Sequence, residues 1–411
     1  MRTAGSGTAR SVETYDVLIV GGGNAGVSLA ARLLRLGVGS VAIVEPEPTH
    51  VYRPLLNYVG GGQARLDDAT RPAADVAPPG VTWVADAVVA VDVPRRSVST
   101  RDGRTLGWGS LVVCPGLEED WDAVPGLQEA YGAGWAGSTF LVDAAARVAR
   151  DLAALDRGTV VFSVPPDPAP CAATALKPLT LAVERWRRAG HLDDLDLHLV
   201  LPEESVTGVE AVDRRLDAVL ERAGVRVHRR SRVERLECGD GPGGRRVVVA
   251  TPTGSLTLHP TYAHVVPPYR APDWIRDADL ADGSSAGLLA LDPETLQHRR
   301  HASVWGLGDV SGATPRPSGG ALRKQTPVLA HNLLVAARGG AAEELRRYDG
   351  YTVMPVTTGR RHLLLAEVDR AGHRAHSVPR PLVERPGRLL WAFDRYVLPQ
   401  VYFRRILRGR A

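Results

Sequence analysis

The chain has 411 residues, of which 44% are hydrophobic, and its formal net charge is +4. This length favours two or more packed domains, and only three cysteines argue against a secreted disulfide scaffold. Eight arginines and two acids lie from residue 379 onward, a balance of +6 that leaves −2 for the rest of the chain. Positive charge confined to one apolar tail argues against a nucleic-acid partner.

The first fourteen residues are small and polar and contain no apolar run. They lack the hydrophobic segment of a signal peptide, so we expect residues 1–14 to form a disordered tail. No uninterrupted run of eighteen apolar residues follows, and no membrane-spanning helix is therefore predicted.

A β-loop-α-β pattern opens the folded part of the chain. Residues 15–20 form an apolar run, an amphipathic helical pattern follows, and a second strand over 41–44 ends at Glu45. The loop before the helix reads Gly21-Gly22-Gly23-Asn24-Ala25-Gly26. This spacing is typical of a dinucleotide-binding turn in a Rossmann-like unit.

Each residue type in this loop has a physical role. Gly21 permits the tight turn, Gly23 lets the backbone approach a pyrophosphate, and Gly26 lets helix and strand pack closely. The helix that begins near Asn24 offers free N–H groups to the phosphates. Glu45 lies 19 residues beyond Gly26 at a strand end, where it can bind a ribose hydroxyl. A glycine-rich turn without a ligand is the weaker alternative.

The remaining pattern predicts an α/β fold with two Rossmann-like domains, parallel sheets and a small α-rich C-terminal segment. The FAD-binding domain is expected over 15–120 and 289–345, the second domain over 121–288, and the C-terminal domain over 346–411. Further strands and helices are predicted at these positions: strands at 81–93, 97–100, 110–113, 158–164, 195–201, 225–228, 264–268 and 302–309, helices at 172–190, 211–224 and 319–338, and a hairpin over 233–258.

A second element favours FAD over NAD as the dinucleotide. The run Trp305-Gly306-Leu307-Gly308-Asp309 ends a predicted strand and precedes a glycine-rich helix start. Asp309 can bond a flavin hydroxyl, and the N-terminus of the next helix can face the flavin pyrimidine oxygen. An ordinary aspartate that caps a turn is the alternative, and the first motif weighs against it.

The second domain lacks the loop that a pyridine nucleotide needs. After the strand at 158–164 the chain reads PPDPAP over 165–170, where a second glycine loop would be expected. Proline offers neither conformational freedom nor an N–H group for a phosphate. This argues against an NADH:quinone oxidoreductase and for another electron donor.

Three side chains are candidates for catalysis. Cys171 follows the proline loop and precedes a predicted helix, whose N-terminus should lower the thiol pKa and favour the thiolate. A buried structural cysteine is the alternative. Lys177 and Lys324 are the only lysines among 50 basic residues, and a compact ammonium can act where arginine cannot.

Several long segments of the chain resemble sulfide:quinone oxidoreductases. They are VEPEPTHVYRPLLNYVGGG at 44–62, Cys171 with Lys177, DPETLQHRR at 292–300 followed by GLGD, RKQTPV at 323–328 and YDGYTVMPVTTG at 348–359. The resemblance implies two Rossmann-like domains, a membrane-docking C-terminal part, oxidation of sulfide at a cysteine pair beside FAD, and reduction of a quinone. It also implies cofactor contacts at Arg53, Gly116 and Gln325, and a persulfide on Cys171.

The chain departs from the family pattern at one essential position. The second redox cysteine should follow the Gly-Asp pair, but that position is Val310, and a family lysine seven residues further on is replaced by Pro317. Neither Cys114, before a Pro-Gly stop, nor Cys238, beside a glycine-rich turn, is a convincing substitute. Cys171 could still attack a flavin position, or hold a persulfide and release it to a small thiol.

The tail over 387–411 alternates aromatic residues with arginines. This composition suits an interfacial helix pair broken at Pro399, and predicts a cytoplasmic, monotopic protein on the inner face of the cell membrane. A helix docked on the body or on a second subunit is the alternative, and a homo-oligomer is compatible with the sequence. No metal site is predicted.

We therefore expect an FAD-dependent oxidoreductase that passes electrons from sulfide or a small thiol to a quinone. Lys177 and Lys324 would hold anionic sulfur or reduced flavin by charge. Two alternatives stay open: a diverged flavoenzyme that acts on an organic thiol or a biosynthetic intermediate, and a non-catalytic flavin-holding partner at a membrane.

Overall fold

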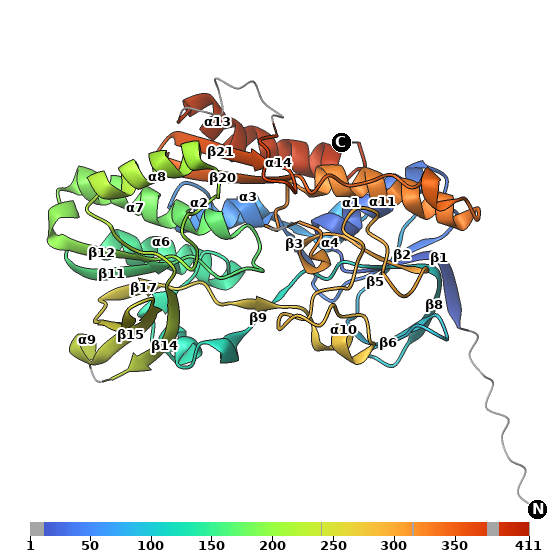
Figure 1. The fold of residues 1–411 in the computed structure, drawn as a ribbon, viewed down its shortest axis with the longest axis horizontal. Coiled ribbons are helices and arrows are strands. Elements are labelled where there is room, and N and C mark those ends of the chain that lie inside the picture. The colour runs from blue at the N-terminus through green and yellow to red at the C-terminus, as the bar shows by residue number, and fades with distance from the viewer. Residues whose placement is uncertain (1–11, 240, 315, 376–385, 411) are drawn as a thin grey trace, which may run out of the picture.

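The computed structural model describes residues 12–239, 241–314, 316–375 and 386–410. Two α/β halves lie side by side, and the C-terminal segment runs along one edge of both (Figure 1). The short strands β9 (Glu118–Glu119) and β18 (Tyr269–Arg270) pair where the chain passes between the halves. The α/β fold predicted from the sequence is confirmed.

The first half contains a seven-stranded sheet around the N-terminal strand. Its order is β5 (Thr82–Val84), β2 (Val41–Val44), β1 (Glu13–Val20), β8 (Thr105–Val113), β7 (Ser97–Thr100) and β6 (Val88–Asp92), with β19 (Val304–Gly306) also paired to β8. The strands β5, β2, β1, β8 and β19 run parallel to one another, whereas β7 pairs antiparallel with both β8 and β6. The helices α1 (Asn24–Arg35) and α11 (Leu322–Ala337) pack together beside them.

The disordered tail expected over residues 1–14 is too long by at least two residues. Glu13 and Thr14 belong to β1, where they pair with Leu106 and Gly107 of β8. Both residues are exposed, so the strand end carries no apolar signal, and backbone pairing alone extends the sheet. Residues 1–11 lie outside the described residues.

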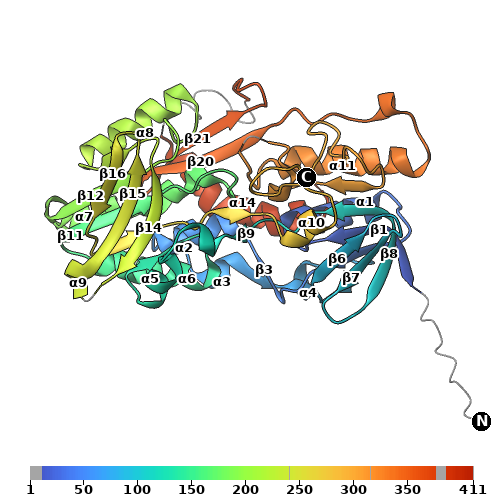
Figure 2. The same ribbon diagram turned by 60° about the horizontal axis from the view of Figure 1, so that its bottom comes forward.

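The second half contains a five-stranded parallel sheet. Its order is β10 (Ala136–Gly137), β17 (Tyr262–His264), β11 (Gly158–Ser163), β12 (Leu195–Val200) and β13 (Arg226–His228). One face packs against the helices α6 (Val142–Ala154), α7 (Leu176–Ala189) and α8 (Glu210–Arg222). The other face packs against an antiparallel sheet of β14 (Arg232–Cys238), β15 (Arg245–Thr251) and β16 (Gly254–Leu258), visible in Figure 2. The hairpin expected over 233–258 is therefore a three-stranded sheet.

Short elements connect these layers and bring the halves together. In the first half they are β3 (Thr49–Val51), η1 (Arg53–Leu55), α2 (Leu56–Gly60), α3 (Leu66–Ala69), β4 (Thr70–Pro72) and α4 (Ala73–Val76). Further along the chain they are η2 (Trp121–Ala123), α5 (Leu127–Gly132), η3 (Ala172–Ala175), η4 (Leu192–Asp194), α9 (Gly241–Gly244), α10 (Asp273–Asp277), η5 (Asp309–Ser311) and η6 (Ala342–Glu344). The helix α2 packs against both α6 and α7 of the second half.

The C-terminal segment contributes side chains to both halves. Its hairpin of β20 (Thr352–Gly359) and β21 (His362–Val368) supplies Met354, Val356, Leu364 and Ala366 to the core of the second half. The residues Tyr348 and Tyr351 before the hairpin pack in the core of the first half. The C-terminal segment was expected to be α-rich and no hairpin was predicted in it, and the burial of this hairpin ties the segment to the body.

A C-terminal helix follows the hairpin and spans 388–406. It consists of α13 (Arg388–Ala392), a π-helical stretch Phe393–Val397, α14 (Leu398–Val401) and a second π-helical stretch Tyr402–Ile406. The predicted break at Pro399 is wrong, because the wider π-helical stretch before Pro399 accommodates a residue that cannot donate a backbone hydrogen bond. Among the described residues, no helix is long and apolar enough to cross a membrane.

The C-terminal helix is apolar on two faces. Its inner face buries Leu390, Asp394, Arg395, Pro399, Tyr402 and Leu407. Its outer face exposes four large apolar side chains, Leu389, Phe393, Tyr396 and Val397, which we call the outer stripe. Docking on the body therefore accounts for only one of the two apolar faces.

Candidate functional site

The glycine loop between β1 and α1 has the geometry that the sequence predicts. Gly21 has a φ of +110°, and a Cβ atom there would lie 2.3 Å from the Cys114 carbonyl oxygen. A Cβ atom at Gly26 would lie 1.9 Å from the Gly21 carbonyl oxygen, so only glycine allows this close packing of helix and strand. A Cβ atom at Gly23 would meet nothing within 4 Å. Gly21 and Gly26 are therefore packed against backbone atoms, whereas the space beside Gly23 is free of protein atoms.

Glu45 closes this loop from the end of β2. Its Oε2 atom accepts a hydrogen bond from the Gly22 N–H at 2.6 Å, and its Oε1 atom accepts one from the Glu47 N–H at 2.9 Å. The carboxylate therefore lies beside the N-terminus of α1, with lone pairs left for a ribose hydroxyl. Asn24 starts α1, and its amide contacts the Gly319 carbonyl oxygen at 3.4 Å.

The second predicted motif lies between β19 and α11. Gly308 has a φ of +82°, and its N–H donates to the buried Gln325 side-chain oxygen at 2.9 Å. No described residue donates a hydrogen bond to the Asp309 carboxylate, and burial raises its pKa to about 6 against the opposing charge of Arg53. Asp309 thus has free acceptor capacity, as a residue that binds a cofactor hydroxyl requires. Gly116, with a φ of +81° and open space around it, follows β8.

Four side chains from distant segments share one electrostatic neighbourhood. Burial raises the pKa of Asp309 and of Tyr269, and the charge of Arg53 opposes this rise at both residues. The Arg53 guanidinium donates to the Phe140 carbonyl oxygen at 3.3 Å. The Asp309 carboxylate in turn raises the pKa of Cys171 and of Tyr269. These effects of charge connect Arg53 with Asp309 and Asp309 with Cys171, although no hydrogen bond or ion pair among the described residues joins them.

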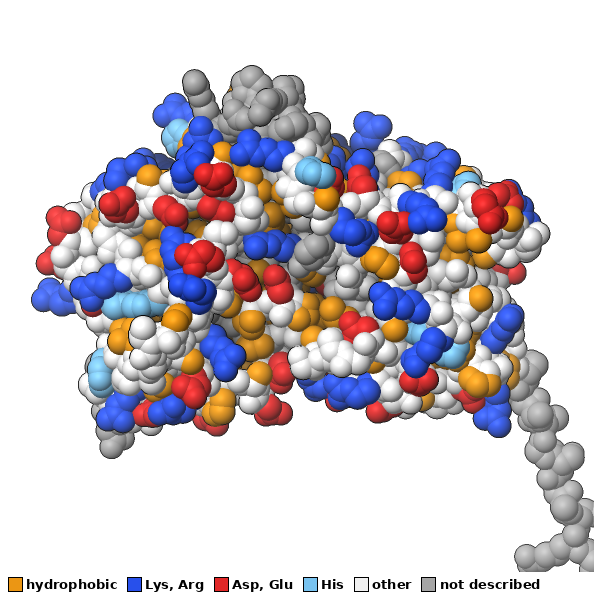
Figure 3. All heavy atoms as spheres, viewed as in Figure 1, with side chains coloured by type: hydrophobic (Ala, Val, Ile, Leu, Met, Phe, Trp, Pro, Cys, Tyr) orange, Lys and Arg blue, Asp and Glu red, His pale blue; other side chains and the backbone are white. Residues whose placement is uncertain are grey.

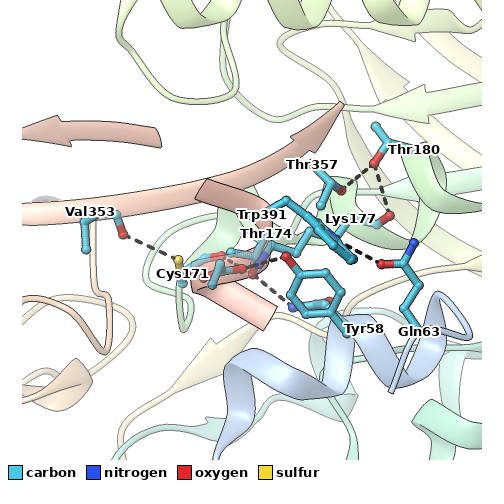
Figure 4. A network of polar contacts seen from close by, with 11 residues as sticks. Tyr58, Gln63, Cys171, Thr174, Lys177, Thr180, Val353, Thr357 and Trp391 are labelled. Carbon is cyan, nitrogen blue, oxygen red and sulfur yellow. Dashed lines mark hydrogen bonds and ion pairs between the residues drawn. The ribbon is translucent and has the colours of Figure 1, made fainter. Parts of the chain in front are cut away.

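Cys171 occupies a strained turn between the proline loop and η3. Its φ is +54°, its N–H donates to the Pro317 carbonyl oxygen at 2.8 Å, and its own carbonyl accepts from Thr174. The sulfur lies 3.9 Å from the Val353 carbonyl oxygen of β20 (Figure 4). A non-glycine residue in this backbone region is uncommon and is held there by its surroundings.

The expectation that a helix N-terminus lowers the Cys171 pKa is wrong. Burial raises the pKa of the thiol to about 12, and the charges of Asp309 and Asp394 raise it further, against the opposing effect of Lys177. The turn η3, which begins after Cys171, continues directly into α7, but the burial of the thiol outweighs any effect of this helix N-terminus. Near neutral pH the side chain is a thiol, and its proton must leave before it can act as a nucleophile.

Lys177 lies on α7 and is fully buried. Its Nζ atom lies 2.8 Å from the Asp394 Oδ2 atom of the C-terminal helix and 4.5 Å from the centre of the Tyr58 ring. The Tyr58 hydroxyl donates to the same carboxylate oxygen at 2.7 Å (Figure 4). The Lys177 charge is thus paired with a carboxylate of the C-terminal helix. Removal of one partner would cost on the order of 3–5 kcal/mol of stability.

Lys324 is not part of this site. Its side chain is 55% exposed, its Nζ atom lies 4.0 Å from Asp349, and it sits on the outer face of α11. The adjacent Gln325 is buried, because successive helical residues point in different directions. The expectation that Lys324 holds anionic sulfur together with Lys177 is therefore not supported.

The sequence could have placed a second redox thiol at three positions: Val310, Cys114 and Cys238. Val310 is fully buried in an apolar cluster of the first half, so the position of a second redox cysteine is packed with hydrocarbon. Cys114 is buried, its thiol lies 3.7 Å from the Gly21 carbonyl oxygen, and burial raises its pKa. Cys238 is exposed at the end of β14. All three cysteines of the chain are free thiols.

An open pocket adjoins Cys171 at the carboxyl ends of β11 and β12. Its volume is about 20 Å³, close to the space of one water molecule, and it is lined by Cys171, Asp167, Glu203, Arg316 and Met354 among others. The Arg316 guanidinium is fixed by a hydrogen bond of 2.8 Å to the Val206 carbonyl oxygen. Such edges of parallel sheets are where α/β proteins bind ligands.

Sequence reasoning missed the polar partners of the site. Asp394, Tyr58 and His50 become recognisable only when the C-terminal helix is placed on the body. One signal was available: Asp394 is one of only two acids among eight arginines in the apolar tail. A lone carboxylate in such a helix is often buried and paired.

Comparisons with known proteins agree with this geometry. The family model for pyridine nucleotide-disulphide oxidoreductases matches residues 15–135. The mitochondrial sulfide:quinone oxidoreductase of Dictyostelium discoideum is 31% identical, with 96% of this chain and 86% of that protein covered. The sulfide:quinone oxidoreductase structure from Aquifex aeolicus has a TM-score of 0.77 at 15% identity, and covers 97% of this chain and 92% of that one.

A chain in the mitochondrial ATP synthase structure of Tetrahymena thermophila has the same fold. Its TM-score is 0.81 at 19% identity, and the match covers 99% of both chains. At this identity the similarity concerns the fold alone. The same architecture therefore occurs in a chain of a different assembly.

The open space above Gly23 generates a prediction about cofactor binding. Gly23→Ala should leave the fold intact, because the added Cβ meets no protein atom, but should weaken FAD binding by about tenfold or more. Flavin content after purification and circular dichroism would measure the two effects. Gly132→Ala, which also has nothing within 4 Å, is the control and should retain FAD.

The raised pKa of Cys171 generates a second prediction. Because the thiolate is the reactive form, labelling of Cys171 by iodoacetamide should accelerate about tenfold per pH unit from about pH 7 to about pH 10. Mass spectrometry of the Cys171 peptide would give the rates. A plateau near pH 8.5, where an ordinary cysteine ionises, would contradict the buried environment described above.

Proposed function

The chain belongs to the sulfide:quinone oxidoreductase family and is an FAD-dependent oxidoreductase, and on this premise we propose that it passes electrons from sulfide or a related sulfur nucleophile through FAD to a quinone. The observation that carries the proposal is the position of Cys171. This thiol shares an electrostatic neighbourhood with Asp309 of the cofactor motif and also borders the open pocket. A sulfur carrier between a substrate pocket and a flavin needs both neighbours.

Gly23, Glu45 and Asp309 would hold the cofactor at its pyrophosphate, ribose and flavin ends. When bound, FAD supplies a two-electron acceptor. Cys171 would carry the sulfur atom that becomes oxidised, and its proton must first leave against the effect of burial. The Lys177 ammonium favours that loss through its charge, although its direct partner is Asp394.

The sulfur bound to Cys171 would leave through a small thiol, because no second thiol lies at Val310. A thiolate attacks the outer sulfur of the Cys171 persulfide, forms a new S–S bond, and releases the Cys171 thiolate. The acceptor thiol would approach Cys171 from the side of this pocket, whose lining includes Arg316 as a positive charge for an anionic acceptor.

The proline loop after β11 disfavours a nicotinamide donor. The strand β11 ends in Val164, followed by Pro165 and Pro166, which provide no glycine loop for a pyrophosphate. Electrons would therefore enter from sulfur.

The quinone would be reached from a membrane surface. The outer stripe of the C-terminal helix exposes four large apolar side chains, and Arg388, Arg404 and Arg405 are exposed beside it. Apolar side chains flanked by arginines suit insertion at the interface between acyl chains and headgroups. Elsewhere, charges of both signs are spread over both halves on the face in Figure 3. We propose peripheral attachment to the inner face of the cell membrane.

A second candidate function is favoured by Val310. Without a cysteine pair, the enzyme would act on an organic thiol or a biosynthetic intermediate instead of sulfide. Both functions use the same cofactor, and they differ in whether Cys171 carries sulfur.

Anaerobic reduction by sulfide tests the proposal. Sulfide should bleach the flavin of the native protein, and Cys171→Ser should slow bleaching by about a hundredfold or more, because the sulfur carrier is lost. Cys238→Ser, at the exposed cysteine, is the control and should react normally. Flavin that stays oxidised at excess sulfide, with and without an added thiol, would sink the proposal. Unchanged turnover of another thiol by Cys171→Ser would support the second candidate.

The outer stripe predicts a measurable affinity for lipid vesicles. Replacement of Leu389 and Phe393 by serine should reduce the vesicle-bound fraction by about tenfold or more, since two large apolar side chains no longer insert. Co-sedimentation with anionic phospholipid vesicles would measure it. Leu36→Ser, at an exposed leucine at the C-terminal end of α1, should bind as before. Equal binding of all three proteins would exclude the stripe as the docking surface.

A further inference from the structure

Both backbone polar groups of Gly22 are held by side chains. The Gly22 N–H donates to Glu45 Oε2 at 2.6 Å, and the Gly22 carbonyl oxygen lies 3.1 Å from the Nδ1 atom of His50. His50 lies on β3 and is only 4% exposed. Two side chains from different strands therefore set the orientation of this part of the glycine loop.

This orientation determines where the Gly23 N–H points. In a planar trans peptide the C=O and the following N–H point in opposite directions. Because the Gly22 carbonyl points to His50, the Gly23 N–H points away from it, and no described residue accepts a hydrogen bond from this N–H. The space above Gly23 is also free of protein atoms. An unpaired donor at the start of a helix is the feature that binds a pyrophosphate.

His50 is held in turn by the C-terminal helix. Its Nε2 atom lies 2.6 Å from the hydroxyl of Tyr402, which is 2% exposed, and the two rings stack at 5.8 Å. Since the Gly22 carbonyl can only accept, Nδ1 carries the proton and Nε2 accepts from the Tyr402 O–H. The ring of Tyr52 packs against Tyr402 at 4.4 Å and keeps the hydroxyl in place.

We propose that His50 and Tyr402 are positioning residues for the FAD pyrophosphate. Tyr402 holds the ring of His50, His50 fixes the Gly22 carbonyl, and the Gly23 N–H is thereby directed at the phosphate. The C-terminal helix, whose outer stripe faces away from the body, is thus part of the cofactor seat. This inference requires FAD binding alone and does not depend on the identity of the electron donor.

The rate of FAD release from the purified holoprotein tests this inference. Tyr402→Phe removes one hydroxyl and should accelerate release about tenfold, measured as the rise of flavin fluorescence after dilution. Tyr396→Phe removes an exposed hydroxyl from the same helix and should leave release unchanged. His50→Phe retains an aromatic ring and should accelerate release at least as much as Tyr402→Phe.

The double variant distinguishes a positioning chain from general destabilisation. If Tyr402 acts only through His50, then adding Tyr402→Phe to His50→Phe should not accelerate release further. Effects that multiply would overturn the proposal. So would a Tyr402→Phe protein that unfolds at a lower temperature yet releases FAD at the native rate. If Tyr402→Phe does not fold, His50→Phe against Tyr396→Phe decides, and native release from His50→Phe overturns the proposal.

Discussion

The buried ion pair of Lys177 and Asp394 determines how the parts of this protein are held together. It joins α7 of the second half to the C-terminal helix, and Tyr58 adds a hydrogen bond from α2 of the first half. A charged pair with almost no access to solvent is tolerated only when its geometry is complete. The C-terminal helix is therefore an integral part of the body. If it detached, Lys177 would lose its partner and remain as an unpaired charge.

The Lys177–Asp394 pair also acts on Cys171, the proposed sulfur carrier. Lys177 and Asp394 act in opposite directions on the pKa of Cys171, and burial outweighs both. The result is a protonated thiol between the cofactor motif and an open pocket. Because Val310 leaves no second thiol, the proposed persulfide on Cys171 would lose its sulfur by a route other than an internal disulfide, and we propose the pocket beside Arg316 as that route.

Two separate contacts link the C-terminal helix to the site. Asp394 accepts a hydrogen bond from Lys177, whose charge acts on Cys171, and Tyr402 reaches the glycine loop through His50. The opposite face of this helix carries the outer stripe. One helix thus presents apolar side chains to the exterior, neutralises the buried lysine and orients the cofactor loop. Any displacement of the helix would act on all three at once.

The sequence by itself determined the features that depend on local conformation and spacing. Gly21, Gly23 and Gly26 specify the loop, the acid at Glu45 follows at the right distance, and the absence of a thiol at Val310 is visible in the chain. Only the tertiary structure decided the features that depend on distant partners. Lys177 and Asp394 are 217 residues apart, and His50 and Tyr402 are 352 apart. The raised pKa of Cys171 and the outward position of Lys324 likewise follow from burial, which sequence spacing cannot specify because it arises from how whole elements pack.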